Sequence, residues 1–201
     1  GIFNINQATF YTTIQEALNS AAANDVISVN VGSYAENLVW PSTTGIRLQG
    51  QSDGASINIR IDGSAAGTVI TIDQAVSASI VNLTVQNGSS NSSDWGGGGI
   101  FVGAGVSFLG LTDVYVSGNR ASNAGGGVYL ANQNAHWFEN TSFVSNTADT
   151  GGAISASSNL TLLSVLFSLN DAGSKGGAIY SGAVVDNAAN PITLSYVLVQ
   201  N

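Results

Sequence analysis

Aspartates, a single histidine and three tryptophans are the side chains of this 201-residue sequence that could take part in catalysis or binding. A polysaccharide lyase needs clustered aspartates to hold calcium beside a basic side chain, and a glycoside hydrolase needs carboxylates that face one groove. The aspartates are instead scattered, and no two of the following lie within three residues of each other: Asp53, Asp62, Asp73, Asp94, Asp113, Asp149, Asp171 and Asp186. We therefore assign no catalytic residues from local motifs.

Residues far apart in the sequence can still meet if the chain repeats, and glycine pairs recur here at spacings of 28, 26 and 25 residues. Counting back from these pairs places one set of polar side chains at a single corner of the repeat. This candidate surface patch consists of Asp94, Trp95, Arg120, Asn123, Asp149, Asp171 and Lys175. Asp149, Asp171 and Lys175 are expected to lie closest together. The sequence favours the alternative interpretation, a solvated turn whose ion pairs contribute little to stability.

The histidine and the tryptophans give no independent sign of an active site. His136 has no second histidine or thiol with which to share a metal, so we expect it to pack beside Trp137 and assign it no catalytic role. Trp40, Trp95 and Trp137 could stack on sugar rings, but core or interface positions are the preferred interpretation. We expect no cofactor and no metal.

The composition excludes several classes of partner. Charged residues make up only 8% of the chain, against roughly 25% in average proteins, and the net charge is −8. Four basic residues cannot form the stripe that nucleic acid binding requires, and they make an anionic membrane surface an improbable partner. Without cysteine there are no disulfides or thiolate metal sites. No apolar run approaches the ~20 residues that span a bilayer, so we expect no membrane insertion.

Short strands are predicted between the glycine pairs. Apolar residues alternate with polar ones there, as at Val81, Leu83 and Val85, and this period of two indicates β-strands. Short strands in a repeat of this length predict an all-β fold, a right-handed parallel β-helix of about eight coils that rise ~4.8 Å each. The glycines would allow positive φ and close backbone approach at one corner: Gly97, Gly98, Gly125, Gly126, Gly151, Gly152, Gly176 and Gly177.

An asparagine recurs after the strand that precedes each corner. These asparagines are Asn87, Asn119, Asn146, Asn170 and Asn201. A buried asparagine carries two donors and a double acceptor, so it can bond both to a turn and to the asparagine of the next coil. We therefore predict an asparagine ladder, in which Asn146 would be buried while Asn132 would lie on the surface.

The N-terminal residues follow a different pattern. A short helix is predicted within residues 11–25, with Thr13 and Glu16 as a capping box. Its buried face would consist of Ile14, Ala17, Leu18 and Ala21. The helix would cover the first coil of a single domain. We divide this domain into residues 1–25 (strand and capping helix), 26–77 (first coils) and 78–201 (glycine-asparagine repeat coils).

Two resemblances cover nearly the whole chain. Residues 13–40, "TIQEALNSAAANDVISVNVGSYAENLVW", look like the start of secreted right-handed β-helix proteins of the pectate-lyase-like superfamily. The later units, such as "FVSNTADTGGAIS", resemble the repeats of chlamydial polymorphic outer-membrane proteins. The first resemblance implies a fold that includes polysaccharide lyases and hydrolases. The second implies a surface-displayed, adhesin-like protein.

Our leading functional hypothesis is a secreted, non-enzymatic β-solenoid with a structural or adhesive role at the cell surface. It rests on the low charge, the Ser/Thr/Asn-rich composition and the missing catalytic cluster. A carbohydrate-active enzyme, either a lyase or a hydrolase, and a sugar-binding module are the alternatives. The start at Gly1 fits a processed secreted protein or a trimmed chain. Partners would be a host or cell-surface glycan or protein, or a second copy of the chain.

Self-assembly and glycosylation are further expectations. Residues Ile2, Phe3, Asn4, Ile5 and Asn6 could add as a strand to the C-terminal coil of another subunit, giving a head-to-tail filament. Sequons occur at Asn82, Asn87, Asn91, Asn140 and Asn159, of which Asn91 is the best acceptor. Asn87 is harder to reconcile with a glycan because it is also a ladder position.

Overall fold

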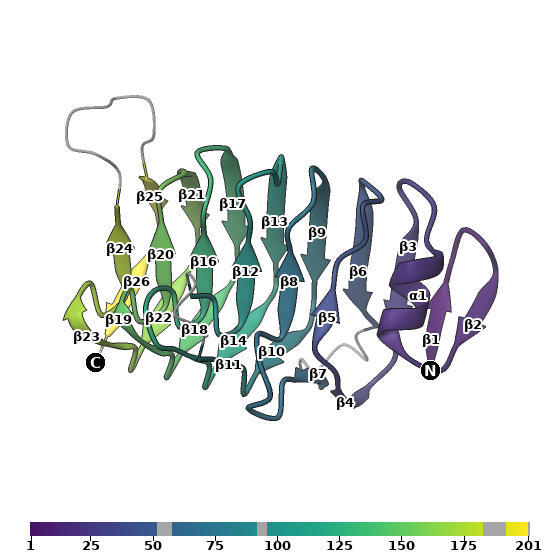
Figure 1. The fold of residues 1–201 in the computed structure, drawn as a ribbon, viewed down its shortest axis with the longest axis horizontal. Helices are drawn as coiled ribbons and strands as arrows, with labels where there is room; N and C mark the ends of the chain where they lie inside the picture. The colour runs from purple at the N-terminus through teal and green to yellow at the C-terminus, as the bar shows by residue number, and fades with distance from the viewer. Residues whose placement is uncertain (52–57, 92–95, 183–191, 201) are drawn as a thin grey trace.

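The chain winds into a parallel β-helix whose coils stack along one long axis (Figure 1). The computed structural model describes residues 1–51, 58–91, 96–182 and 192–200. The coils contribute strands to four parallel sheets, which we number in the order in which the chain crosses them, and the third sheet begins only with the third coil. The predicted fold class is confirmed, although about eight coils was slightly too many. Seven strands form the second sheet within the described residues.

The strands of each sheet come from successive coils. The first sheet contains β3 (Val26–Val29), β6 (Ile46–Gly50), β9 (Ser77–Val81), β13 (Phe108–Thr112), β17 (Ala135–Glu139), β21 (Asn159–Leu163) and β25 (Ile192–Ser195). The second contains β4 (Gly32–Ala35), β7 (Ile59–Asp62), β10 (Thr84–Gln86), β14 (Tyr115–Ser117), β18 (Ser142–Val144), β22 (Leu166–Ser168) and β26 (Leu198–Gln200). Side chains alternate along these strands, which places one face of each sheet in the core and the other in solvent.

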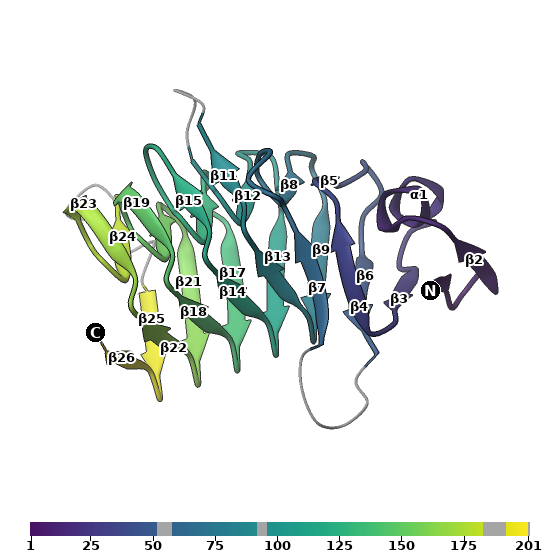
Figure 2. The same ribbon diagram turned by 90° about the horizontal axis from the view of Figure 1, so that it is seen from below.

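Two shorter sheets complete the coil. The third contains β11 (Ser89–Ser90), β15 (Arg120–Ala121), β19 (Thr147–Thr150) and β23 (Asp171–Lys175). The fourth contains β5 (Leu38–Val39), β8 (Ile70–Ile72), β12 (Ile100–Val102), β16 (Val128–Leu130), β20 (Ile154–Ala156) and β24 (Ile179–Ser181). In the view from below, the third sheet follows the second across a sharp corner (Figure 2).

The core is a column of stacked apolar side chains, because register repeats from coil to coil. Val116, Phe143 and Phe167 occupy one position in three successive strands of the second sheet, and all three are fully buried. The rings of Phe143 and Phe167 stack with centroids 5.2 Å apart. Inward-facing residues of the other sheets stack in the same way, as the alternation in the sequence predicted.

Helix α1 (Ile14–Ser20) covers the N-terminal end of the column. The predicted capping box is present, with Thr13 and Glu16 satisfying each other's backbone N–H groups. The Glu36 carboxylate accepts two more hydrogen bonds, from the N–H groups of Ile14 and Gln15 at 3.0 Å each. Leu18 is fully buried on the inner face. The helix thus protects apolar residues that a bare first coil would expose.

The expectation that residues 2–6 are free for another subunit is not met. Strand β1 (Ile2–Asn4) pairs with β3 of its own chain, antiparallel and with Ile2 opposite Val29. Its other edge pairs with β2 (Thr9–Tyr11). The main-chain groups of β1 are therefore used within the chain. At this end of the sheet β2 is the edge strand, and its Phe10 side chain is 76% exposed.

The asparagine ladder runs through three coils, along the corner between the second and third sheets. Asn119 Nδ2 donates to Asn146 Oδ1 at 3.0 Å, and Asn146 Nδ2 donates to Asn170 Oδ1 at 3.0 Å. The same amides also donate to main-chain carbonyls of the preceding coil, as from Asn146 to the Val116 oxygen at 2.9 Å. Asn119 and Asn146 are fully buried, and the ladder satisfies their amides.

Asn87 does not belong to this ladder. Gln86 pairs with Ser117, so Gly88 rather than Asn87 stands beside Asn119, and its N–H donates to Asn119 Oδ1 at 2.9 Å. The spacing in the sequence was misleading, because a shift of one residue in register turns a side chain to the opposite face. Asn201 lies outside the described residues. Val199 rather than Leu198 pairs with Phe167, so the three-residue spacing counted back from Asn201 does not match the register.

The glycine pairs lie at the corner that leads into the fourth sheet. The first glycine of each pair has φ between 63° and 77°, the left-handed region that favours glycine: Gly97, Gly125, Gly151 and Gly176. The second glycine of the first three pairs faces the backbone of the following coil. A Cβ atom on Gly126, for example, would collide with the carbonyl oxygens of Thr147 and Gly152.

Candidate functional site

One row of side chains on the third sheet contains most of the predicted surface patch. Register pairs Ser89 with Arg120, Arg120 with Thr147, and Thr147 with Asp171, one residue in each coil. At ~4.8 Å per strand, the backbones of Arg120 and Asp171 lie roughly 10 Å apart. Arg120 and Asp171 are both exposed. The row therefore presents one guanidinium and one carboxylate to solvent on the same face.

A depression of about 380 Å³ lies on the C-terminal side of Arg120. Its lining consists of Arg120, Ala121, Ser122, Thr147, Ala148, Asp149, Asp171 and Gly173. The Ser174 hydroxyl lies 3.0 Å from both the main-chain oxygen and Oδ2 of Asp149, which ties two coils together beside the depression. Two exposed carboxylates and one arginine thus share one hollow.

A second depression, of about 420 Å³, lies on the N-terminal side of Arg120. Its lining consists of Asp62, Ser64, Ala65, Asn87, Gly88, Ser89, Gly118 and Arg120. Asp62 Oδ2 accepts hydrogen bonds from Gln86 Nε2 at 2.8 Å and from Asn87 Nδ2 at 2.7 Å. Asp62 Oδ1 accepts one from the Ser64 N–H at 2.8 Å. Asn87 therefore lines this depression and binds Asp62, and it is not part of the ladder.

The hydrogen bonds around Asp62 hold its side chain ionised. Partial burial by itself raises the pKa of this carboxyl, but the donors from Gln86, Ser64 and Asn87 together lower the pKa below its ordinary value. All of these donors bind the charged form. Asp62 is therefore a fixed negative charge whose oxygens already accept hydrogen bonds. Such a carboxylate is better suited to holding its neighbours in position than to accepting a proton.

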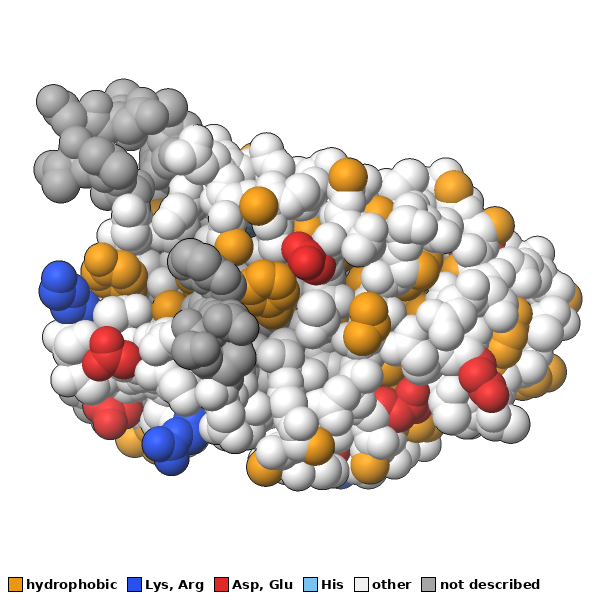
Figure 3. Space-filling view, viewed as in Figure 1, with side chains coloured by type: hydrophobic (Ala, Val, Ile, Leu, Met, Phe, Trp, Pro, Cys, Tyr) orange, Lys and Arg blue, Asp and Glu red, His pale blue; other side chains and the backbone are white. Residues whose placement is uncertain are grey.

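Arg120 joins the two depressions. We call the surface formed by Asp62, Asn87, Arg120, Asp149 and Asp171 the Arg120 face. Acidic and basic side chains gather over β15, β19 and β23 at the lower left of the space-filling view (Figure 3). Carboxylates can act as general bases, and a guanidinium can stabilise an oxyanion. The arrangement can therefore support hydrolysis of an ester or a glycoside.

The sequence identified part of this face. The structure brings Arg120, Asp149 and Asp171 together, as the counting predicted. Lys175 lies at the end of β23, where its Nζ stands 6.0 Å from the Tyr180 ring centroid. Asp94 and Trp95 lie outside the described residues. Sequence reasoning missed Asp62 and Asn87, although their 25-residue separation, one coil, was a usable signal.

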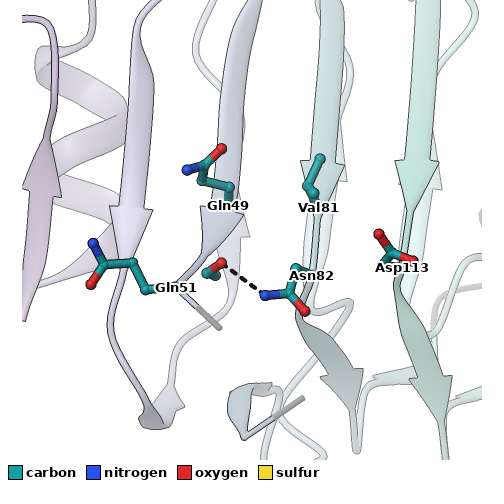
Figure 4. A pocket seen from close by; sticks show the side chains of 6 residues that line it. Gln49, Gln51, Val81, Asn82 and Asp113 are labelled. Carbon is teal, nitrogen blue, oxygen red and sulfur yellow. Dashed lines mark hydrogen bonds between the residues drawn. The ribbon is translucent and has the colours of Figure 1, made fainter. Parts of the chain in front are cut away.

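A third hollow has a structural origin. It measures about 590 Å³ and is lined by Gln49, Gly50, Gln51, Val81, Asn82 and Asp113, at the turn from the first to the second sheet (Figure 4). Asn82 and Asp113 both have positive φ, so each makes this sharp turn in its own coil. Asn82 Nδ2 donates to the Gly50 oxygen at 3.0 Å. Among the described lining residues Asp113 is the one carboxylate and none is basic, which offers little for catalysis.

His136 is buried in the solenoid rather than placed in either depression. Its Nδ1 accepts a hydrogen bond from the Leu109 N–H at 3.0 Å, which leaves the proton on Nε2, 2.8 Å from Asn132 Oδ1. Burial lowers the pKa of His136 to about 4. The expectation that Asn132 lies on the surface was wrong, because its amide fills an interior turn and it is 5% exposed.

The three tryptophans differ in burial. Trp40 is buried in the core at 1% exposure, and Trp95 lies outside the described residues. Trp137 lies on the outer face of the first sheet, where 41% of it is exposed. Within the described ranges no cluster of three or more His, Asp or Glu side chains could hold a metal ion. No helix in those ranges is long and apolar enough to cross a membrane.

Comparison with known proteins agrees with both resemblances. Residues 164–182 match the family model of the Chlamydia polymorphic membrane protein repeat. This segment is one unit of the coil, running from the end of the first sheet into the fourth. No curated protein sequence matches the chain.

Two solved structures share the fold. Pectin methylesterase from Aspergillus niger, in deglycosylated form, matches with a TM-score of 0.58 and 15% identity, over 94% of this chain and 63% of that one. Pectin methylesterase PemA from Erwinia chrysanthemi matches with a TM-score of 0.59 and 15% identity, over 98% and 64%. This chain therefore spans just under two thirds of the length of each. Such low identity shows the fold alone.

These structures correct the expectation of a non-enzymatic protein. Both are enzymes, and both share the β-helix over nearly the whole of this chain. The fold therefore does not mark the chain as an inert scaffold.

Proposed function

We propose that this chain is a carbohydrate-active enzyme that hydrolyses ester groups of a polysaccharide at the Arg120 face. The observation that carries the proposal is the position of Arg120, between two depressions that each contain carboxylate side chains. The reaction class is taken from the two pectin methylesterases that share the fold. The match to a surface-protein repeat supports an extracellular or cell-surface location.

The roles follow from exposure and hydrogen bonding. Asp149 or Asp171 accepts a proton from water, and the hydroxide so formed attacks the ester carbonyl carbon. The Arg120 guanidinium donates to the carbonyl oxygen as negative charge develops there. The C–O bond to the alkoxide then breaks, and the alkoxide takes the proton from the aspartic acid and leaves as an alcohol. The carboxylic acid that remains ionises to water; it stays on the polymer when the substrate is a methyl ester and is released as acetate when the substrate is an acetylated sugar. Asp62, held by Gln86 and Asn87, is a positioning residue that fixes the hollow beside Arg120.

The shape of the Arg120 face suits a polymer. The two depressions follow one another along the solenoid axis, across the coils that contribute β11, β15, β19 and β23. A chain of sugars lying along that axis would pass Arg120 with its flanking units in the two hollows. A small isolated ester would occupy only part of this surface.

The test is hydrolysis of a panel of esterified polysaccharides, followed by pH-stat titration of the acid released. Methyl-esterified polygalacturonate and acetylated xylan would represent the two orientations of the ester. We expect turnover of at least one, reduced on the order of 100-fold or more in Asp149→Asn or Asp171→Asn and in Arg120→Gln. Asp73→Asn, an exposed aspartate outside both depressions, is the matched control. No turnover by the wild-type chain would reject the proposal.

Adhesion at a cell surface is a second candidate. It is supported by the match of residues 164–182 to a repeat of a chlamydial membrane protein. Binding of the purified chain to cell-wall or host-cell preparations, measured with the Arg120→Gln variant alongside, would test it. Undiminished binding by that variant would place adhesion on a surface other than the Arg120 face.

A further inference from the structure

The outer face of the first sheet contains an aromatic platform that lies apart from the Arg120 face. Trp137 is 41% exposed and Phe108 is 37% exposed, both on outward-facing positions of adjacent strands β17 and β13. Gly110 pairs directly with Trp137. A Cβ atom added to Gly110 would lie 3.1 Å from Cε1 of Phe108, so the phenyl ring leans over this glycine. The two aromatic side chains therefore adjoin the same bare position.

Small polar side chains continue the row on both sides. Register aligns Ser79, Gly110, Trp137, Thr161 and Thr193 in five successive coils. None of these neighbours is large enough to cover the indole ring. The result is a flat strip with hydroxyl groups before and after one large aromatic surface.

We infer that this strip is a second, non-catalytic binding site for a neutral polysaccharide. Sugar rings present apolar C–H faces that stack on aromatic side chains, with hydroxyl groups at their edges for the serine and threonine side chains. The charges near Trp137 suit an uncharged ligand. The Glu139 carboxylate accepts the Trp137 indole N–H at 3.4 Å. The basic residue of the row is Arg47, which pairs with Ser79 and lies three strands away from Trp137. An acidic polymer would be repelled by the Glu139 carboxylate beside Trp137. A protein partner is disfavoured because the apolar area is small and is surrounded by hydroxyl groups.

The site is independent of the proposed chemistry because it faces a different direction. The chain passes through the second sheet between the first sheet and the third sheet. A variant of the strip should therefore leave the reaction at Arg120 unchanged on a small soluble ester. The same variant would weaken retention on the polymer.

Affinity electrophoresis in gels that contain β-glucan, xylan or galactomannan, with polygalacturonate as the acidic comparator, tests the inference. We expect at least one neutral polymer to retard the wild-type chain, and Trp137→Ala to weaken that affinity about tenfold or more. Trp137→Thr repeats the test with the residue that the next coil carries at this position, so the strand is preserved. Phe10→Ala removes an exposed aromatic side chain elsewhere and should bind as the wild type does.

The outcomes separate this inference from the proposed function. Asp149→Asn should keep full retardation in the neutral gel, whether or not the chain hydrolyses esters. Retardation only by polygalacturonate, no retardation by any neutral polymer, or unchanged retardation of both Trp137 variants would each overturn the inference.

Discussion

Individual polar side chains inside the solenoid decide how well neighbouring coils are joined. Asn146 is the central member of the ladder, and its side chain bonds to residues of both adjacent coils. Asn119 holds the preceding position in the same way, and Asn170 the following one. Removing the side-chain amide in the middle of the ladder therefore breaks hydrogen bonds in three coils. Removing an amide on the outer surface breaks none of these bonds.

We predict that Asn146→Ala lowers the free energy of unfolding by about 1–3 kcal/mol, because buried donors and acceptors lose their partner. Asn30→Ala, at an exposed asparagine, is the control and should change stability far less. Asn132 cannot serve as that control because it is buried. Chemical denaturation of the three proteins gives the comparison. Equal unfolding midpoints for wild type and Asn146→Ala would show that the ladder does not stabilise the fold.

His136 makes the stability of the fold depend on pH between its pKa in the folded protein and its pKa in the unfolded chain. The folded protein keeps this histidine neutral, with a pKa of about 4, while an unfolded histidine titrates near 6.5. Between these values the unfolded chain binds more protons, so stability falls as the pH drops through the window. The loss should reach on the order of 3 kcal/mol when the pH approaches 4.

The measurement is thermal unfolding between pH 7 and pH 4, with His136→Gln as the comparison, and the wild type should lose more stability. The chain has one histidine, so its imidazole signals can be followed without ambiguity by NMR. The native spectrum should show the tautomer protonated on Nε2. A titration midpoint near 6.5 in the folded protein would contradict the prediction.

At the scale of single elements, the corner before the fourth sheet is set by backbone contacts rather than by side chains. Gly126 lies between two coils, against the carbonyl oxygens of Thr147 and Gly152. Thr147 belongs to β19, and the Gly152 oxygen accepts a hydrogen bond from the Gly127 N–H at 3.3 Å, so both oxygens are held in place. Gly125, beside it, has a φ of 63°. The pair therefore combines a turn conformation with a close approach.

We predict that Gly126→Ala destabilises the protein by about 1–3 kcal/mol, because the added methyl group overpacks a rigid site. Gly105→Ala is the matched control, since its nearest neighbour atom would lie 3.7 Å from the new Cβ. Differential scanning calorimetry of the two variants provides the measurement. If Gly126→Ala melts at the same temperature as Gly105→Ala, the corner is more compliant than its geometry indicates.

At the scale of the whole molecule, the solenoid offers long faces that differ in chemistry. The third sheet carries the charged Arg120 face, and the first sheet carries the Trp137 strip. Each face is a row with one residue per coil, so a linear polymer lying along the axis can contact several coils at once. Helix α1 covers the N-terminal end. The sides of the rod, rather than its covered end, are therefore where extended ligands would bind.

The sequence by itself determined the architecture of this protein. Alternating strands such as Asn159–Leu163, the recurring glycine pairs and the Thr13–Glu16 box are local patterns, and each one dictates local geometry directly. The alternation of Val81, Leu83 and Val85 is not one strand, because Asn82 turns the chain between β9 and β10. Repetition of those patterns then requires stacked coils. It also placed Arg120, Asp149 and Asp171 at one corner, because the repeat length sets which residues meet.

Only the tertiary structure decided the register within each coil, and with it the fate of individual side chains. Asn87 and Asn119 follow aligned strands and lie in turns of equal length, because Gln86 pairs with Ser117 and Ser89 with Arg120. Asn87 stands one position earlier in its turn than Asn119 does, so its side chain points outward to Asp62 while Asn119 lies in the core. The strand pattern gives the positions of the strands but not which turn position faces the core, so such a one-residue offset does not appear in it. The exposure of Trp137 and the burial of Trp40 depend in the same way on which face of a strand each residue occupies.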